Sequence, residues 1–426
     1  MTRPATRTTT FVRTELILYT LGFLAFFLFG LVQAGYGPSY PALGREYGQP
    51  VAVVGVVASL HFAGSAVGTL LLGALLTRLS LRSSLMVAAL GLVLGLLGVA
   101  LSPTWGLLLT GATLGGLAYG MLSAGLNLAF AELGPGPSNL VNGLFGVGSV
   151  VSPILVTLLA KGSHSPPFLL MAVMAAALAV GVRLLWPKPA QTRPVQTKPV
   201  QIQSTQSEGR STIQAKAAGA CEDPENDIPG STLPQQPPPV SKRVMTLFGT
   251  CFLLYVGIEA GYGNWATTYF ARLGAGQPEL LTSFYWLALT AGRFASAALG
   301  SRFAPLQVLS FGTGGAMLGS ALMLLGGLRL APYGLVLAGF CIAPIFSTQL
   351  AWFTRSQPPR LAPYMLTLGS VGGAVLPALT GLALPRLGLV SVPLAPLVIA
   401  ALLLVCAALL NRQLKTRRPI PELLAS

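Results

Sequence analysis

The sequence is short of charge: only 9% of its 426 residues are Asp, Glu, Lys or Arg, where a soluble domain has about 25%. A chain of this length with so few charges cannot cover a water-soluble surface. Only 11 residues are acidic, against 26 Lys and Arg, and the net charge is +15. Nucleic-acid-binding proteins show such an excess too, but here the basic residues lie between long apolar runs. The composition therefore predicts a polytopic membrane protein without a nucleic-acid partner.

Groups that perform covalent chemistry are also scarce. The two His and four Cys have no metal-binding spacing and no paired spacing, and Cys251, Cys341 and Cys406 lie in apolar runs, where a buried role is expected. The sequence has no Gly-rich phosphate-binding loop and no cluster of ionisable residues. We therefore predict that the protein has no cofactor or metal, is not an ATP-driven pump and is not an enzyme.

Apolar sequence, by contrast, is abundant in runs of the length that crosses a bilayer, about 20 residues. Breaks such as Gly37-Pro38 and Ser102-Pro103 separate these runs. The fold class predicted is an all-α membrane protein with twelve transmembrane helices. The expected spans are 15–40, 51–76, 83–101, 105–131, 139–160, 166–186, 244–270, 279–300, 306–329, 332–353, 361–386 and 390–411.

The basic residues predict the orientation. With a cytoplasmic N-terminus, twenty of the 26 Lys and Arg lie on the inner side and five on the outer side, while Arg293 lies inside a span. This distribution follows the positive-inside rule. We expect an integral protein of the bacterial inner membrane with both termini in the cytoplasm.

A polar segment divides the chain. Residues 187–242 are rich in Pro, Gln, Thr and Ser and hold five of the 11 acidic residues, a composition typical of disorder. We interpret them as a disordered cytoplasmic linker between a bundle at 15–186 and a bundle at 243–411. Each bundle has six spans, and cytoplasmic tails at 1–14 and 412–426 flank them.

The two halves resemble each other in sequence. Gln33–Gly37 reads Gln-Ala-Gly-Tyr-Gly, and Glu259–Gly263 reads Glu-Ala-Gly-Tyr-Gly, at an offset of 226. Two further matches have an offset of 224: Ser59 and Gly68 with Ser283 and Gly292, and Val147–Pro153 with Val371–Pro377. Three matches at nearly one offset indicate a duplication and hence two pseudo-symmetric bundles.

Glu259 is the acidic residue that lies deep in a predicted span. An ionisable group at the centre of a membrane helix costs at least about 2.5–3.5 kcal/mol, so it needs a function or a partner. Tyr255 and Tyr262 share its helix face, and the duplication places Gln33 and Tyr36 on the opposite wall of a central cavity. An amide, a carboxylate and aromatic rings suit a neutral polar solute such as a sugar, although aromatic stripes also pack helices.

Two further titratable residues lie in spans. His61 lies near the midplane, where it could accept a proton, bind substrate, or simply bond to a neighbouring helix as a neutral side chain. Arg293 lies closer to the cytoplasm, where it could contact an anionic group or brace the helix. Because Arg293 and Glu259 lie at different depths, the sequence alone does not predict a direct ion pair between them. The predicted substrate-binding residues are Gln33, Tyr36, Asn127, Glu259, Tyr262 and Trp265, and those predicted for proton coupling are Glu259 and His61.

Two parallel six-span halves resemble the major facilitator superfamily over essentially the whole chain. In that superfamily the loop between spans 2 and 3 carries Gly-x-x-x-Asp-Arg-x-Gly-Arg/Lys-Arg/Lys, and here Gly73–Arg82 keeps the first Gly, Arg78 and Arg82. Thr77 replaces the Asp and Ser80 the second Gly, which puts the conformational lock of this motif in doubt. The resemblance implies rocking of the two halves about a midplane site, with structural or gating roles for Arg78, Arg82 and Arg293.

Spans 7 and 8 look like those of the fucose-permease and glucose/galactose transporter group. The matching residues are Tyr255-Val256-Gly257-Ile258-Glu259, Trp265, Tyr269, Ser283-Phe284-Tyr285-Trp286 and Thr290-Ala291-Gly292-Arg293, with Asn127 at the end of span 4. Fucose-permease-type proton symporters carry acids in spans 1 and 4, where this chain has Gly37 and Ser123. Proton coupling, if it occurs, must then use Glu259 or His61.

These observations predict a monomeric secondary transporter of a small polar solute, a sugar being one candidate, in a lipid bilayer and with protons as a potential partner. Efflux of drugs or metabolites is the alternative, because an aromatic cavity with one acid also suits lipophilic cations. A membrane sensor would need a structured cytoplasmic domain, which residues 187–242 do not supply.

Overall fold

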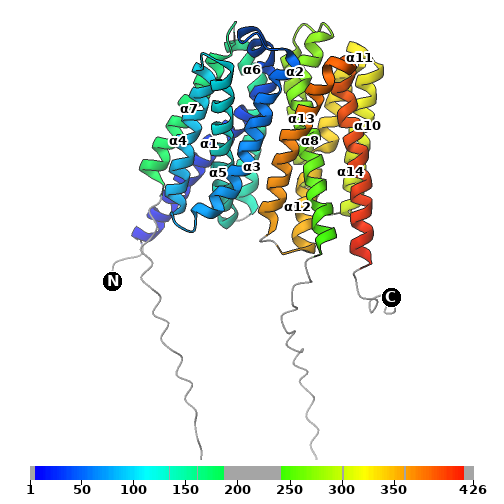
Figure 1. Cartoon of the computed structure of the whole chain (residues 1–426). Coiled ribbons are helices and arrows are strands. Elements are labelled where there is room, and N and C mark those ends of the chain that lie inside the picture. The colour runs from blue at the N-terminus through cyan, green and yellow to red at the C-terminus, as the bar shows by residue number, and fades with distance from the viewer. Residues whose placement is uncertain are drawn as a thin grey trace, which may run out of the picture. The chain divides into compact units, whose positions relative to one another are not determined.

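The computed structural model describes residues 5–133, 135–160, 162–186, 241–299, 302–358 and 361–416. Within these ranges the regular structure is helical throughout (Figure 1). The N-terminal half contains α1 (Ala5–Glu46), α2 (Val51–Val54), α3 (Val56–Leu75), α4 (Leu81–Leu101), α5 (Trp105–Leu133), α6 (Pro135–Leu159) and α7 (Ser165–Leu185). The C-terminal half contains α8 (Lys242–Arg272), α9 (Pro278–Leu299), α10 (Pro305–Leu325), α11 (Gly327–Ile342), α12 (Ile345–Ser356), α13 (Ala362–Leu387), a 3₁₀ turn (Gly388–Val390) and α14 (Ser391–Lys415).

These helices account for the predicted spans. Ten helical stretches of the described residues are long and apolar enough to cross a membrane, and the last, Ala362–Lys415, joins α13 and α14. With α13 and α14 separated and α9 added, the passes are consistent with the twelve predicted. The all-α membrane class is confirmed, whereas the predicted linker, apart from Ser241 and Lys242, lies outside the described residues.

The predicted helix break at Gly37-Pro38 is wrong. Helix α1 runs through Pro38 and Pro41 to Glu46. It begins at Ala5, and its apolar, membrane-spanning part begins at Leu16, close to the predicted residue 15. Proline removes an N–H from the helical ladder, so Pro38 and Pro41 leave the carbonyl oxygens of Ala34 and Gly37 without their helical donors. Membrane helices tolerate proline where neighbouring helices surround the interrupted turn, and Gly37 is in direct contact with Gly263 and Asn264 of α8. The break expected at Ser102-Pro103 is present, because α4 ends at Leu101.

Matching glycines hold the corresponding helices together in the two halves. Gly148 of α6 packs on α1, where a Cβ would lie 2.1 Å from the Phe27 carbonyl oxygen. Gly372 of α13 packs on α8, where a Cβ would lie 1.9 Å from the Leu253 carbonyl oxygen. These contacts repeat at the offsets seen in the sequence, so corresponding helices of the two halves pack against each other in the same way. Only residues without a side chain allow two membrane helices to approach so closely.

The two halves touch at the predicted outer end through the outer contact, which comprises Gly37, Gly55, Gly263, Asn264, Trp265 and Gly381. A Cβ at Gly37 would lie 2.7 Å from the Gly263 carbonyl oxygen and from the Asn264 Cα, and one at Gly55 would lie 2.7 Å from the Trp265 ring. The indole nitrogen of Trp265 donates to the Pro377 carbonyl oxygen at 2.9 Å. The Trp265 indole thus fills the space that is left because Gly55 and Gly381 have no side chains.

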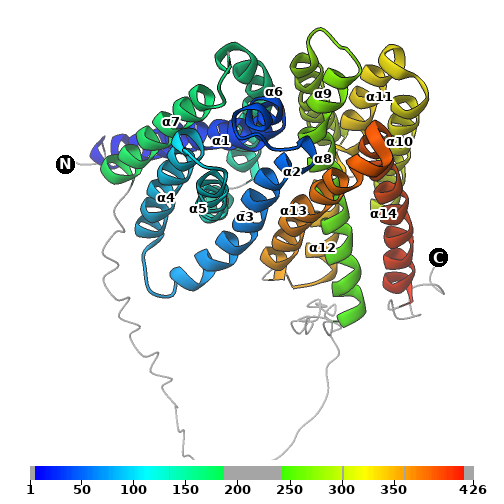
Figure 2. The same ribbon diagram turned by 45° about the horizontal axis from the view of Figure 1, so that its top comes forward.

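Away from the outer contact, α3 and α13 diverge toward the predicted cytoplasmic end (Figure 2). Phe62 of α3 still packs on Gly373. At Gly73, three turns further along α3, an added Cβ would have no neighbour within 4 Å. On the other side of the molecule, α6 and α9 remain in contact, with Gly146 against Thr290. The halves are therefore closed at the outer end and part between α3 and α13 below it.

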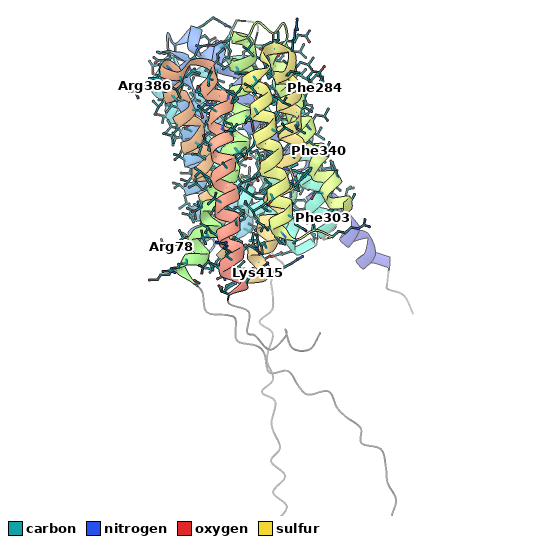
Figure 3. All side chains as sticks on the ribbon, turned by 90° about the vertical axis from the view of Figure 1, so that its right-hand side faces the viewer. Arg78, Phe284, Phe303, Phe340, Arg386 and Lys415 are labelled. Atoms are coloured by element: carbon teal, nitrogen blue, oxygen red, sulfur yellow. The ribbon has the colours of Figure 1, made fainter. Side chains whose placement is uncertain are left out.

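The surface of the helices is apolar, as a bilayer requires. Phe284, Phe340 and Phe303 are exposed at successive heights along one side (Figure 3). Arg78 and Lys415 lie at the predicted cytoplasmic end and Arg386 at the opposite end. Helices α1 and α8 begin, and α14 ends, at the end that carries Arg78 and Lys415 (Figure 1). This distribution agrees with the predicted orientation.

A His–Glu pair at the outer end ties three helices together. Glu46, the last residue of α1, pairs through its carboxylate with Nδ1 of His164 and accepts from the His164 backbone N–H at 3.2 Å. Nε2 of His164 lies 2.8 Å from the Val99 carbonyl oxygen in α4. His164 is buried and precedes α7. Both ring nitrogens face oxygen acceptors, and this fixes the loop before α7 to α1 and α4.

We expect Gly55→Leu to open the outer contact, because a leucine there overlaps the Trp265 ring. Overpacking of this kind costs about 1–3 kcal/mol, and a free energy of that size changes the ratio of two conformations by about 5–150-fold. Spin labels at Arg45→Cys and Arg272→Cys, on the outer ends of α1 and α8 in a Cys221→Ser background, should then report longer distances. Gly106→Leu is the control, since Gly106 has open space around it. Equal distances in both variants would contradict this outer closure.

We expect His164→Phe to lower the thermal stability of the purified protein. The variant keeps a ring but leaves the Val99 carbonyl and the Glu46 carboxylate without their partner, and an unsatisfied buried group costs about 1–3 kcal/mol. Fluorescence-detected unfolding in detergent measures the change in Tm. Glu132→Gln, which changes an exposed carboxylate, should leave Tm unaltered. A Tm for His164→Phe equal to that of the control would show that the pair does not stabilise the fold.

Candidate functional site

A buried ion pair joins α8 and α9 at mid-depth. Nη2 of Arg293 donates to both carboxylate oxygens of Glu259, at 3.1 and 3.2 Å. The side chain of Glu259 is 8% exposed and that of Arg293 is 33% exposed. At a rise of 1.5 Å per residue, Glu259 lies about 26 Å along α8 from Lys242. The sequence did not decide whether Glu259 and Arg293 form an ion pair, and the structure shows that they do. The two opposite charges thus lie together within the membrane-spanning helices.

Two tyrosines hold the carboxylate segment in place. Tyr255, one turn before Glu259 on α8, donates to its Oε2 at 2.5 Å. Tyr285 of α9 donates to the Glu259 backbone carbonyl oxygen at 3.0 Å. Both tyrosines are fully buried. The carboxylate therefore has a fixed position, while the guanidinium keeps the exposed edge of the pair.

The N-terminal half places an aromatic ring against this pair and, on α1, a polar amide that is bonded within its own half. The Arg293 guanidinium carbon lies 5.9 Å from the centre of the Phe145 ring of α6, within the range of a cation–π contact. In the same half, Tyr119 of α5 donates to Oε1 of Gln33 at 2.9 Å. Gln33 is half-buried, so its amide group retains an accessible side.

His61 lies behind Gln33 in a tightly packed polar pair with Tyr36. The Tyr36 hydroxyl and His61 Nδ1 are 3.2 Å apart, and both side chains are buried. The His61 ring also packs against Tyr119, with 5.2 Å between ring centres. Within the described residues Nε2 of His61 has no hydrogen-bond partner. Tyr119 thus contacts both Gln33 and His61.

The other predicted substrate ligands lie apart from the ion pair. Tyr262 donates to the Ala316 carbonyl oxygen at 3.1 Å and lies 2.6 Å from the Ser320 hydroxyl of α10. Trp265 belongs to the outer contact. Asn127 donates to the Ser123 carbonyl oxygen at 2.9 Å and remains half-exposed on α5. Tyr262 and Trp265 are fully buried in this conformation, so their contact with substrate stays a prediction.

The loop between α3 and α4 carries the two arginines of the family-like motif. Arg82 donates to the Arg183 carbonyl oxygen at the end of α7, and Arg78 is exposed. Thr77, which stands in the place of the motif's Asp, donates to the Ala74 carbonyl oxygen of its own helix at 2.7 Å. Arg82 thus braces the N-terminal bundle internally, and the missing carboxylate leaves Arg78 without the ion pair that the family motif would offer.

Sequence reasoning missed Tyr119, Phe145 and the contact of Cys251 with Cys406. Tyr119 lies in a Gly-rich span, and a buried hydroxyl is almost always hydrogen-bonded. Its hydroxyl was therefore a signal in the sequence for a polar partner on a neighbouring helix. The sulfur atoms of Cys251 and Cys406 lie 3.4 Å apart as free thiols, although 155 residues separate them. The expected burial of Cys251, Cys341 and Cys406 is confirmed. Within the described residues no group of three or more potential ligands could hold a metal ion.

Comparison with known proteins gives the family. The family model described as Major Facilitator Superfamily matches residues 22–368. A candidate glucose/galactose transporter of Helicobacter pylori (strain J99 / ATCC 700824) is 29% identical over 132 residues. That match covers 30% of this chain and 32% of the relative, so the chain spans about a third of the length of the curated relative that it matches.

Solved transporters share the fold over nearly the whole chain. The xylose transporter XylE from E. coli, in a partially occluded inward-open conformation, has a TM-score of 0.68 at 12% identity, covering 94% of this chain and 99% of XylE. The nucleoside transporter NupG has a TM-score of 0.65 at 15% identity, covering 94% and 98%. A variant of the E. coli fucose:proton symporter FucP has a TM-score of 0.58 at 16% identity, covering 93% and 99%. With its apolar helices, its duplicated glycine contacts and a family-model match over residues 22–368, the chain belongs to the Major Facilitator Superfamily of membrane transporters.

Proposed function

We propose that the chain is a secondary active transporter that moves a small, neutral, polar solute, most simply a sugar, by alternating access and together with protons that bind at Glu259. The observation that carries this proposal is the Glu259–Arg293 ion pair, buried at mid-depth and facing the N-terminal half. We place the protein in the bacterial inner membrane as a monomer with both termini in the cytoplasm, as its basic residues predict.

The ion pair favours a neutral solute. Because Glu259 and Arg293 cancel each other's charge, neither is left to attract a cationic or an anionic substrate. The pair still offers hydrogen-bonding atoms, since Arg293 uses one nitrogen on Glu259 and has others free. Hydroxyl groups of a sugar can donate to a carboxylate and accept from a guanidinium at the same time. A site built to bond hydroxyls also rejects analogues that lack them.

The opposite wall supplies the remaining features of a sugar site. Gln33 offers an amide whose position Tyr119 fixes. The half-buried Phe145 ring provides an apolar surface beside Arg293, on which the apolar face of a sugar ring can stack. Polar anchors and aromatic surfaces in a largely apolar pocket are the usual composition of a small-molecule site.

The packing of the two halves supports alternating access. The outer contact seals one end, while α3 and α13 part toward the other. With the predicted orientation this is a cytoplasm-facing conformation. The seal consists of glycine backbones against an indole ring and contains no ion pair, so it can separate without exposing unpaired charges.

Proton coupling through Glu259 follows from the same ion pair. Protonation of the carboxylate removes the charge that holds Arg293, and the freed guanidinium then needs another partner. Solute hydroxyls can supply it, which would link solute binding to the protonation of Glu259. His61 is the second candidate, because its buried Nε2 has no partner among the described residues.

The comparisons support a polar substrate. A candidate glucose/galactose transporter matches part of the chain, and the structural neighbours include transporters of xylose, fucose and nucleosides. All of these substrates carry several hydroxyl groups. Efflux of lipophilic cations remains the alternative that a binding experiment distinguishes.

We expect hexoses, pentoses or nucleosides to raise the melting temperature of the purified protein, because a ligand that binds only the native state stabilises it. A saturating ligand at about 100 times its Kd adds about 2.7 kcal/mol. Lipophilic cations should give no shift. In Gln33→Ala the shift should fall at any given ligand concentration. A shift with cations and none with hydroxylated solutes would overturn the substrate class and favour the efflux alternative.

We expect Glu259→Gln to remove the pH dependence of uptake into proteoliposomes and to lower its rate by at least about tenfold, a change that corresponds to about 1.4 kcal/mol. Glutamine keeps the hydrogen-bonding shape but cannot take up a proton. Glu279→Gln is the matched control at the outer start of α9 and should retain wild-type uptake. If Glu259→Gln retains the wild-type pH profile, Glu259 is not the proton carrier, and His61→Gln becomes the next variant to examine.

A further inference from the structure

A groove of about 390 Å³ lies between the first turn of α8 and the last turns of α14. It is separate from the candidate site, because Lys242 lies about 26 Å along α8 from Glu259 at 1.5 Å per residue. Both helix ends lie at the predicted cytoplasmic end (Figure 1). The residues that line the groove are Lys242, Arg243, Thr246, Leu247, Leu409 and Gln413.

The groove is positively charged and has no acidic lining residue. Lys242 and Arg243 are exposed, and neither forms an ion pair within the described residues. Arg412 and Lys415 follow on the last turn of α14, and Figure 3 shows Lys415 at this end of the molecule. Two cations thus line the groove, and two more lie on the neighbouring last turn of α14.

The backbone adds to this positive potential. Ser241, the residue before α8, provides no side-chain cap to the helix. The first N–H groups of a helix have no partner within it, and together with the helix dipole they attract anions. Here that end of α8 coincides with Lys242 and Arg243, whose charges act in the same direction.

The floor of the groove is apolar and continues into the membrane. Leu247 and Leu409 line it. Above them Val405 and Leu402 are 58% and 53% exposed, and with Leu409 they form one face of α14. The site is therefore amphipathic along the membrane normal, with cations at the interface and an apolar track in the hydrocarbon region.

We propose that this groove binds one anionic phospholipid, with its phosphate between Lys242 and Arg243 and an acyl chain along Leu409, Val405 and Leu402. Charge complementarity selects an anionic headgroup, and the apolar track selects a lipid over a free phosphate. Juxtamembrane Lys and Arg attract anionic lipids in general at about 1 kcal/mol each. The concave shape between two helices distinguishes this site from the other basic residues at the same end.

The test compares a groove variant with a variant of equal charge. Full-length protein in detergent is titrated with phosphatidylglycerol or phosphatidylcholine, and Tm and the number of lipids retained in native mass spectrometry are recorded. We expect phosphatidylglycerol, and not phosphatidylcholine, to raise Tm and to leave one bound lipid. The variant Lys242→Gln/Arg243→Gln should need at least about tenfold more phosphatidylglycerol for the same Tm shift, equivalent to about 1.4 kcal/mol.

The control variant is Arg302→Gln/Arg355→Gln, which removes two exposed charges at the same end but outside the groove. It should respond to phosphatidylglycerol as the wild type does. Leu409→Trp keeps every charge but fills the apolar track, and it should lose the retained lipid. Free inorganic phosphate should not reproduce the Tm shift.

Three results would overturn the proposal. An equal loss in the control variant would show general surface attraction and no site. A full shift with inorganic phosphate would show an anion site without lipid. A response that appears only after Glu222, Asp223, Glu225 and Asp227 are changed to their amides would show that the chain's own acidic segment takes the groove. Uptake by the groove variant at wild-type rates would separate this site from the transport site.

Discussion

Direct contact between helix backbones is the constraint on which the rest of this structure depends. Glycine supplies 50 of the 426 residues, and at positions such as Gly148, Gly372 and Gly37 an added Cβ would overlap a backbone atom of the next helix. In a bilayer no hydrophobic effect drives helices together, so close van der Waals contact has to stabilise them. The same type of contact joins helices within each half and joins the halves at the outer end. During transport the contacts between the halves must break, whereas the contacts within each half must remain. In agreement with this, many more glycines contact helices of their own half than contact the other half.

Close packing also determines how the polar residues are satisfied. Tyr262, Tyr269 and Trp265 direct their polar atoms to backbone carbonyl oxygens of neighbouring helices. These groups need no charged partner, since a closely packed helix offers an acceptor. Glu259 differs, because a carboxylate in the membrane needs a cation or a proton. Here that cation is Arg293, which bonds both carboxylate oxygens.

The sequence predicted the class, the duplication and the presence of an acidic residue deep in a span at Glu259, since each rests on long apolar runs or on repeated residue types. It did not predict the course of α1 past Pro38, because whether proline ends a membrane helix depends on the neighbouring helices that pack around it, here α8 at Gly37. Nor could it predict the Glu259–Arg293 pair or the Gln33–Tyr119 bond, because helical rotation and tilt decide which side chains meet. The aromatic stripe on α8 was recognised, but its geometry turned Tyr262 and Trp265 into packing and sealing residues in this conformation. Periodicity in the sequence predicts which residues share one face of a helix, but it does not predict which helix or side chain packs against that face.

The duplication itself explains why the charged pair lies in one half. Glu259 corresponds to Gln33, and Arg293, next to Gly292, corresponds to Thr69, next to Gly68. Both members of the pair are thus replaced by neutral residues in the N-terminal half, as they must be if neither charge is stable alone in the membrane. Gln33 now bonds Tyr119, and Thr69 donates to the Ser65 carbonyl oxygen of its own helix. One half therefore carries a neutral hydrogen-bonding wall and the other a titratable one. Under the proposed function, a solute between the two walls would make fixed contacts with Gln33 and contacts with Glu259 and Arg293 that depend on protonation. Binding of a proton at Glu259 would then change the affinity for the solute without any movement of the N-terminal half.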